Sequence, residues 1–307
     1  MRWATCRTTL GERVALVDGT SVRVARGVER LLDLLGDDGE RMAEAAELAH
    51  RDPLDVLDLD DVDLLAPIPV PPSIRDFMAF EEHIANTRGQ AGIDPVWYEQ
   101  PVFYFTNPAA VHAPHTEVAV SPGSTAFDYE LEVAAVVGRG GSDVRPEDAE
   151  AHIAGYTILI DWSARDLQRR EMSARLGPAK GKDSATTLGP YLVTPDELAA
   201  HRSGHGFDLG MRASVNGRTY TDGNWRTVHW SFAELLAYAS RGTRLVPGDV
   251  LGSGTVGRGC ILELSALHGL EEYPWLVPGD EVRAEVDGLG AVSGRIVAGR
   301  DPVPLRG

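Results

Sequence analysis

Three acidic residues lie close together in the stretch FDYELEVAAVV, which runs from Phe127 to Val137. With the two-residue period of a β-strand, Asp128, Glu130 and Glu132 fall on one face, and apolar side chains fall on the other. Like charges at this spacing repel one another. The pattern therefore indicates either a solvated outer face or a site that holds a cation.

A polar, helix-compatible segment follows an apolar, strand-like run in GYTILIDWSARDLQRRE. Asp161 stands where the run ends, a common place for ligands and catalytic groups, although a helix cap is the simpler interpretation of a single Asp there. Arg165 and Gln168 lie three residues apart. In a helix they share a face and could bond one ligand, and otherwise that face is solvated.

A glycine- and proline-rich stretch, GPAKGKDSATTLGP, contains Lys180, Lys182, Thr186 and Thr187. It is not a phosphate-binding Walker loop, because Asp183 follows Lys182 where that motif requires Ser or Thr. A flexible loop with exposed lysines is the simplest interpretation.

Two further segments carry polar groups among apolar ones. Asp76 and His83 lie seven residues apart, on one face if the segment is helical, although one histidine so placed is more often structural than catalytic. Thr255 stands between glycines that let backbone approach a ligand closely. Glu263 is flanked by Ile, Leu and Leu, so its carboxylate needs a partner if it is buried. Only the joint occurrence of these features favours a site.

The chain as a whole has the composition of an ordinary globular protein. Its 307 residues suit one large domain with a smaller appendage. The formal charge of −17 argues against nucleic acid or an anionic membrane as a partner, so a small anionic substrate must meet a local cationic pocket. No apolar run approaches the ~20 residues that span a bilayer, and the start lacks a signal-peptide core. We therefore expect a cytoplasmic protein.

The two cysteines, Cys6 and Cys260, cannot make a disulfide framework or supply a structural zinc site. They fit a reducing compartment. Any metal would thus be held mainly by oxygen ligands.

Turn signals divide the chain near residue 65. Residues 1–65 predict a small α+β unit with short strands around VALVDGTSVRV, a helical stretch from Gly27 to Ala49 and a proline-rich connection. Residues 66–307 predict a β-rich α+β catalytic domain with fewer helices, the better ones being RPEDAEAHIAG and SFAELLAYASRG. The expected strands are PVFYF, ELEVAAVVG, GYTILIDW, DLGMRASVNG, GDVLGSG and GDEVRAEVDGLG.

The segment from about residue 65 to about residue 300 resembles the fumarylacetoacetate hydrolase family. The family pattern of Glu-x-Glu on a strand, followed by Asp at a later strand end, is matched by Glu130, Glu132 and Asp161, which implies that they bind a divalent metal. Asp128 is not a ligand position in the family, so we expect it either to support the ligands from behind or to be solvated. DWSARDLQ and LGPAKGKDSATT resemble its substrate-contacting motif and its lysine and threonine loop. The implied residues are Arg165, Gln168, Lys182 and Thr186.

Two further matches resemble the true fumarylacetoacetases. These enzymes carry a fourth metal carboxylate and a catalytic histidine seven residues apart, matched by Asp76 and His83. A later Glu that orients the histidine is matched by Glu263, in what reads as an LEL strand. Many acylpyruvate hydrolases and oxaloacetate decarboxylases of the family instead carry a histidine and a glutamate close together on a lid helix. Asn86 occupies that glutamate's usual position here.

The match also has departures. The N-terminal unit is shorter than the barrel-like domain of the eukaryotic enzymes, and LVPGDEVRAEVDGLGAVSGRIV is closer to the smaller bacterial members. Glu81 and Glu82 keep a variant of the lid mechanism open. Tyr104 and Thr255 are implied as substrate contacts.

The resemblance implies a metal-dependent hydrolase that cleaves a carbon–carbon bond in a 1,3-diketo acid. Oxygen-only ligation favours Mg²⁺, with Ca²⁺ or Mn²⁺ as alternatives, and a chelated substrate would gain a stabilised enolate. His83, oriented by Glu263, is expected to act as general base on water. Lys182, with Arg165 or Gln168, is expected to stabilise the oxyanion or the substrate carboxylate.

Two other functions stay open. The same site could decarboxylate or isomerise a β-keto acid, because all three reactions pass through an enolate. A metal-stabilised scaffold without activity would be expected to lack His83 or Glu263, and the chain has both. The resemblance also implies mixed, strongly bent β-sheets rolled around the metal site and a homodimer formed through the large domain.

Overall fold

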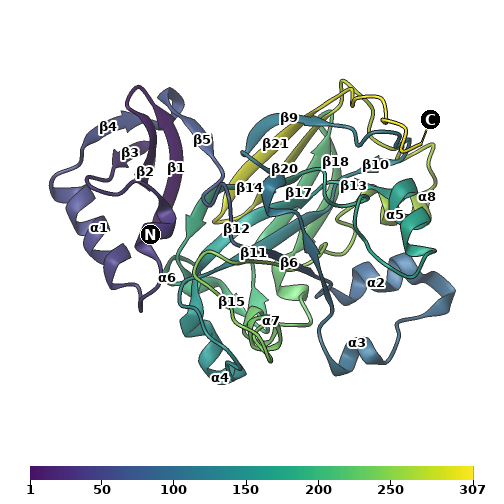
Figure 1. Ribbon diagram of the computed structural model, residues 1–307, viewed down its shortest axis with the longest axis horizontal. Helices are drawn as coiled ribbons and strands as arrows, with labels where there is room; N and C mark the ends of the chain where they lie inside the picture. Colours follow the sequence, from purple (N-terminus) through teal and green to yellow (C-terminus); the bar gives the residue numbers. More distant parts are fainter. Residues whose placement is uncertain (307) are drawn as a thin grey trace.

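A mixed β-sheet of twelve strands is the largest element of the protein in the computed structural model, which describes residues 1–306 (Figure 1). In spatial order its main path is β4 (Asp55–Asp58), β3 (Ser21–Val24), β2 (Gly11–Asp18), β1 (Arg2–Thr8), β14 (Thr186–Val193), β12 (Ile153–Asp161), β11 (Leu131–Val137), β19 (Val250–Gly252), β6 (Ile74–Phe77) and β7 (Phe103–Thr106). Two further strands join it, β5 (Asp63–Leu65) beside β1 and β8 (Val111–His112) beside β14.

A second sheet packs against the first. Its order is β18 (Arg218–Asn224), β17 (Gly210–Val215), β20 (Glu281–Val286), β21 (Gly290–Val297) and β9 (His115–Ala119). Contacts of β21 with β12 and β14 join the two sheets around one apolar core. Two short pairs complete the strands, β10 (Phe127–Asp128) with β13 (Ser163–Ala164) and β15 (Arg202–Ser203) with β16 (Gly206–Phe207). The fold is thus a sheet-rich α+β fold, as the sequence predicted.

Eight α-helices complete the part of the fold that the structure describes. They are α1 (Glu40–Arg51), α2 (Glu81–Arg88), α3 (Val96–Glu99), α4 (Pro146–Ala149), α5 (Arg165–Met172), α6 (Pro195–Leu198), α7 (Phe232–Ala239) and α8 (Ile261–His268). Single 3₁₀ turns are η1 (Leu31–Leu34), η2 (Leu59–Asp61), η3 (Gly89–Ala91), η4 (Pro108–Ala110), η5 (Glu150–His152), η6 (Ala199–His201) and η7 (Trp225–Thr227). In Figure 1, α2, α5 and α8 gather on the side of the molecule opposite α1. No helix within residues 1–306 is long and apolar enough to cross a bilayer.

All six strands expected after residue 65 are present. The central strand β11 is buried along its whole length, so both of its faces lie inside the protein. Helix α7 also follows the prediction, because Ser231 caps it and forms a reciprocal capping box with Glu234. Local chemistry was enough to place these elements.

Two predicted helices are shorter than expected. The helical stretch predicted from Gly27 to Ala49 begins only at Glu40, because Gly36 and Gly39 adopt φ values of +105° and +89°. A left-handed backbone cannot continue a right-handed helix. In RPEDAEAHIAG, only α4 is α-helical before the chain tightens into η5.

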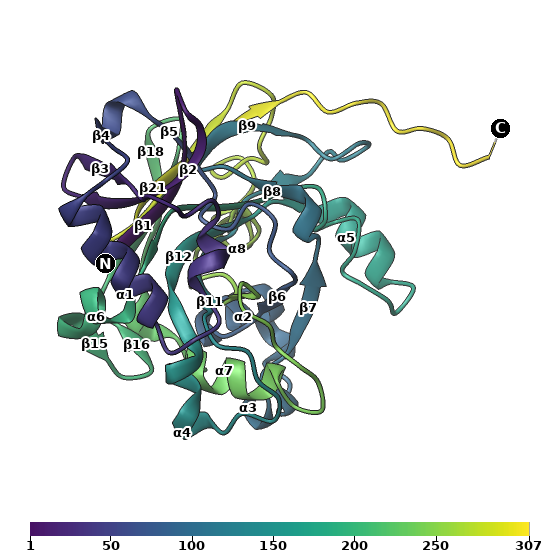
Figure 2. The same cartoon turned by 60° about the vertical axis from the view of Figure 1, so that its left-hand side comes forward.

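The N-terminal strands are continuous with the main sheet (Figure 2). Strand β1 pairs antiparallel with β14 through Arg2 opposite Val193 and Trp3 opposite Leu192. The division into domains near residue 65 remains an interpretation of the sequence.

Candidate active site

Three acidic side chains meet where neighbouring strands of the main sheet lie side by side. Asp76 lies on β6, Glu132 on β11 and Asp161 at the end of β12. Strand β19 runs between β6 and β11, and Gly252 on it is the register partner of Asp76. One oxygen from each of the three acids lies within 4.8 Å of the others.

The oxygens of this carboxylate group are suited to a cation. Asp76 Oδ1, Glu132 Oε1 and Asp161 Oδ1 are buried and have no hydrogen-bond partner within the described residues. Buried polar atoms without a partner are rare and point to an ion or water. A Cβ at Gly252 would lie 2.6 Å from Asp76 Oδ1, so only glycine leaves room for the group. The donor set fits a hard divalent cation such as Mg²⁺ or Ca²⁺.

The charge of this region also favours a cation. Two buried cations, Arg165 and Lys182, face five buried acids. The five acids are Asp76, Asp128, Glu130, Glu132 and Asp161. Burial and the neighbouring acids raise the pKa of Glu132 well above its usual range. Burial also raises the pKa of Asp161 to about 8, although Lys182 acts in the opposite direction. A bound dication would offset most of this excess of negative charge.

Glu130 is held differently from the other three predicted ligands. Its Oε1 accepts a hydrogen bond of 2.7 Å from Arg165, and its Oε2 accepts one of 2.5 Å from Lys182. Burial would raise the pKa of Glu130, but Arg165, Lys182 and His83 outweigh it and hold the pKa well below its usual range. Its role as a metal ligand remains a prediction.

Lys182 is a buried charge and not a mobile loop lysine. Its ammonium group donates to Glu130 at 2.5 Å, Asp161 Oδ2 at 2.6 Å and Ser163 Oγ at 2.7 Å. These bonds use all three of its donors. Burial would lower the pKa of Lys182, but the two acids outweigh it and raise the pKa. The prediction of a loop with exposed lysines is therefore wrong for Lys182. It is correct for Lys180, whose side chain is exposed.

Arg165 and Asp128 link the acidic strand to helix α8. Arg165 lies on α5, as predicted, and donates to Asp128 at 2.8 Å and to Gln168 Oε1 at 3.1 Å. Asp128 also accepts the backbone N–H groups of Ile261 and Leu262, at 2.7 Å and 3.0 Å. A solvated position for Asp128 is therefore excluded, because its side chain is fully buried.

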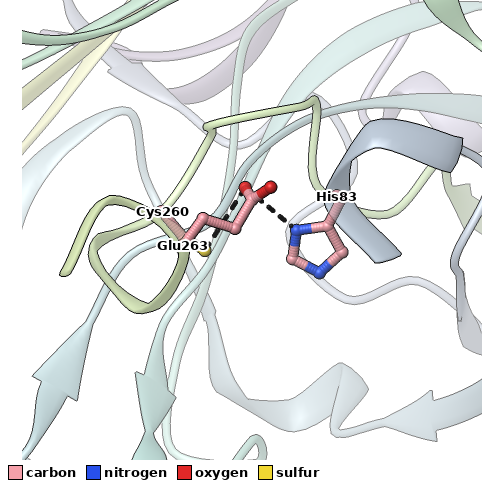
Figure 3. A group of neighbouring side chains, drawn as sticks. All are labelled: His83, Cys260 and Glu263. Carbon is pink, nitrogen blue, oxygen red and sulfur yellow. Dashed lines mark hydrogen bonds and ion pairs between the residues drawn. The ribbon is translucent and has the colours of Figure 1, made fainter. Parts of the chain in front are cut away.

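His83 and Glu263 face each other between α2 and α8 (Figure 3). His83 Nδ1 lies 3.1 Å from Glu263 Oε2, with the ring N–H out of line for a hydrogen bond. Asn86 donates to Glu263 Oε1 at 3.1 Å, and the Gly259 N–H donates to Oε2 at 3.1 Å. The predicted LEL strand is wrong, because Glu263 lies in the first turn of α8. Asn86 thus contacts the glutamate that faces His83.

Asp76 and His83 do not share a helical face, contrary to the prediction. Asp76 lies on β6 and His83 on α2, with a turn between the two elements. His83 still lies near the acidic strand, because Cys260, which is grouped with His83 and Glu263, forms a β-bridge with Glu130. The turn between the two elements, and not helical periodicity, decides where the two residues lie relative to each other.

The remaining predicted residues line the same region. The Tyr104 hydroxyl lies 2.5 Å from Asp161 Oδ2 and 3.1 Å from Asp76 Oδ2. Burial has the larger effect on the pKa of Tyr104 and the two acids add to it, so that the pKa lies well above its usual range. Thr255 is buried in the segment after β19. Thr186 is buried at the start of β14, opposite Asp161 in the register. Their contacts with a substrate stay predictions.

Sequence reasoning missed three contributors: Ser163, Asn86 as a partner of Glu263, and Gly252. Ser163 carries no local signal, because its bond to Lys182 joins separate segments. Gly252 does carry one, since a glycine inside a strand often marks a close approach.

The Fumarylacetoacetate (FAA) hydrolase C-terminal family matches residues 73–297, so the chain belongs to this family of enzymes. It is 29% identical over 261 residues to the human mitochondrial oxaloacetate tautomerase FAHD2A, covering 85% of this chain and 78% of that protein. It is also 29% identical over 283 residues to the fumarylacetoacetase of Oryza sativa subsp. japonica, covering 73% of this chain and 65% of that one.

The solved structure of fumarylacetoacetate hydrolase from the psychrophilic Exiguobacterium antarcticum has the same fold. It superposes with a TM-score of 0.74 at 24% identity, over 97% of this chain and 100% of that chain.

Proposed function

We propose that this protein is a divalent-metal-dependent hydrolase that cleaves a carbon–carbon bond in a 1,3-diketo acid. The observation that supports this most directly is the buried pair of His83 and Glu263, which lies near the acidic strand because Cys260 forms a β-bridge with Glu130. A histidine that faces a buried acid is suited to take a proton from water. Hydrolysis needs such a base, and decarboxylation does not.

The metal would be held by Asp76, Glu132 and Asp161, whose unpaired oxygens fit it, with Glu130 as a fourth predicted ligand. Mg²⁺ is favoured because all the donors are oxygens, with Ca²⁺ or Mn²⁺ as alternatives. When bound, such a cation polarises carbonyl oxygens.

His83 is assigned to activate water. Its Nδ1 faces Glu263, which leaves Nε2 to accept a proton. The water oxygen then forms a bond to one carbonyl carbon, and the bond from that carbon to its neighbour breaks. The electron pair stays on the neighbouring carbon, and the proton held by His83 can be returned there. The negative charge of Glu263 stabilises the imidazolium that forms in between.

Lys182 and Arg165 are assigned to supply positive charge. Every donor of Lys182 is already bonded within the site, so its first role is to hold Glu130 and Asp161 in place. Arg165 holds Glu130 from the other side. Together they offset part of the repulsion that a buried acidic site exerts on an anionic substrate. A direct bond from either cation to the substrate or the oxyanion would require one of these partners to be exchanged.

Kinetics of His83→Ala, Glu263→Gln and the double variant test the pair, with a fumarylacetoacetate-like diketone as substrate. If Glu263 acts through His83, the double variant should lose little more activity than His83→Ala alone. His152→Ala is the matched control, because His152 is as buried as His83, at 8% exposure, and lies on η5 outside the site. If the fold-losses in rate of the two single variants multiply in the double variant, the pairing is refuted.

A tautomerase is the second candidate function. The supporting observation is the 29% identity, over 85% of this chain, to the human protein named oxaloacetate tautomerase. Moving a proton between carbon and oxygen needs a base and an acid but no attacking water. To separate the candidates, kcat/KM for hydrolysis of the diketone is compared with kcat/KM for the enol–keto exchange of oxaloacetate and for its decarboxylation. The hydrolase proposal fails if oxaloacetate is the better substrate.

A homodimer and a cytoplasmic location belong to the same proposal. Sedimentation equilibrium would test the dimer, and cell fractionation would test the location. A monomer at micromolar concentration, or a protein recovered from an organelle as for the mitochondrial relative, would overturn the respective statement.

A further inference from the structure

Cys260 lies beside the pair of His83 and Glu263, at the start of α8 (Figure 3). Its Sγ is 3.8 Å from Glu263 Oε2, and His83 Nδ1 is 3.1 Å from the same oxygen. All three ligand atoms lie within 4.8 Å of one another. The proposed reaction assigns no task to the thiol.

The His83 ring nitrogen in this cluster is uncommitted. Nδ1 is buried and has no hydrogen-bond partner within the described residues, and the side chain of His83 is 10% exposed. It points at Glu263 without alignment for a hydrogen bond (Figure 3). A buried nitrogen of this kind can direct its lone pair at a cation.

The spacing of the three ligands suits tetrahedral zinc. Bond lengths of about 2.3 Å to sulfur and about 2.1 Å to nitrogen and oxygen place neighbouring ligands about 3.4–3.6 Å apart. The two distances to Glu263 Oε2, 3.1 Å and 3.8 Å, bracket that range. Small side-chain shifts would therefore complete the coordination.

We propose that His83, Cys260 and Glu263 form a binding site for Zn²⁺ or a similar soft divalent cation, separate from the carboxylate site, and that its occupation inhibits the enzyme. A thiolate and a carboxylate neutralise the dication, which suits a buried position. Imidazole and thiolate select zinc over Mg²⁺, whereas the carboxylate site has only oxygens. Water would fill the fourth position.

Binding exchanges one proton for one metal–sulfur bond. Burial, and to a smaller extent nearby acids, raise the pKa of the Cys260 thiol well above its usual range. The thiol therefore keeps its proton until a cation binds and the proton leaves to solvent. A metal on Nδ1 of a neutral imidazole leaves the proton on Nε2. Nε2 then cannot take a proton from water, so the inhibition, unlike the binding, rests on the proposed role of His83.

Cobalt absorption tests the site without reference to activity. Co²⁺ added to the Mg²⁺-saturated protein should produce the near-ultraviolet charge-transfer absorption of a cobalt–thiolate bond, which a carboxylate site cannot give. Cys260→Ser and Cys260→Ala should both abolish that absorption. Two substitutions are used so that the test still stands if one of the variants does not fold. Cys6→Ala is the matched control, since Cys6 is equally buried but lies on β1, and it should retain the absorption.

Zinc titration of the Mg²⁺-saturated enzyme tests the consequence. Zn²⁺ should inhibit the wild-type protein, and Cys260→Ser should need at least about 10-fold more Zn²⁺ to halve its own zinc-free rate. No cobalt–thiolate absorption in the wild-type protein, or unchanged absorption in both Cys260 variants, would overturn the site. Absorption without zinc inhibition would confirm the site and count against His83 as the base.

Discussion

A methyl group at position 252 would enter the space of the metal-site carboxylates. In Gly252→Ala, the new Cβ would lie 2.6 Å from Asp76 Oδ1 and 3.1 Å from Glu132 Oε2. Ordinary contact begins at 3.4 Å, so Asp76 Oδ1 would have to retreat by about 0.8 Å, the difference between the two values. Metal–ligand distances tolerate only about 0.2 Å. One of the three ligands would therefore be displaced.

We expect Mg²⁺ or Mn²⁺ to bind 10- to 100-fold more weakly, which corresponds to a loss of about 1.4–2.8 kcal/mol in binding free energy. Loss of a group that supports a metal ligand typically has an effect of this size. Titration calorimetry of metal-free protein measures it directly. Activity at limiting metal should fall in parallel and recover partly at high metal concentration. Thermal unfolding of the metal-free variant shows whether the fold is retained.

Gly210→Ala is the matched control. Its Cβ would meet Asp287 Oδ2 at 2.8 Å and Arg212 at 2.6 Å, a similar clash with a carboxylate. Both of those side chains are exposed and can move aside. A folded Gly252→Ala protein that binds metal within about 3-fold of wild type would refute the reasoning. If that variant does not fold, Glu132→Gln tests the same site with an isosteric change.

Three further predictions concern charge and capping. Because burial raises the pKa of Asp161 to about 8 and that of Glu132 well above its usual range, metal binding must release protons, so metal affinity should rise as the pH rises through about 8; calorimetry across that range would contradict this if affinity were constant. Arg165→Met leaves Asp128 without a cation and Glu130 with Lys182 alone, and it should lower the free energy of unfolding by about 3–5 kcal/mol; a loss below about 1 kcal/mol in urea denaturation would exclude a structural role. Ser231→Ala removes the cap of α7 and should reduce the free energy of unfolding by about 1 kcal/mol with unchanged kcat, and an equal stability would show that the cap is dispensable.

Local patterns in the sequence were enough for the strands. β11 and β12 follow from runs of Val, Ile and Leu, since such residues suit a strand buried on both faces. The acids Glu130, Glu132 and Asp161 were grouped as metal ligands only through the resemblance to the fumarylacetoacetate hydrolase family, because their types and spacing alone also fit a solvated face and a helix cap. Their convergence follows once β11 and β12 are neighbours, because residue 131 of one pairs with residue 160 of the other.

Partners that are distant in the sequence could not be predicted in the same way. Lys182 was expected in an exposed loop, and it is buried because three acceptors from other segments surround its ammonium group. A Cβ at Gly181 would lie 2.7 Å from Gln168, so the loop packs directly on α5. The charge of Lys182 is stable inside the protein only because the fold assembles these neighbours.

Glu263 shows the same limit for secondary structure. The segment CILEL is a short apolar run, and such a run is compatible with a strand or a helix. Its preceding residue, Cys260, gives no side-chain cap to α8. Asp128 accepts the first backbone N–H groups of that helix instead, from 133 positions earlier in the chain. The sequence determined that an acid stands at position 263, and tertiary contact decided that it lies on a helix facing His83, because the cap that starts the helix comes from a distant strand.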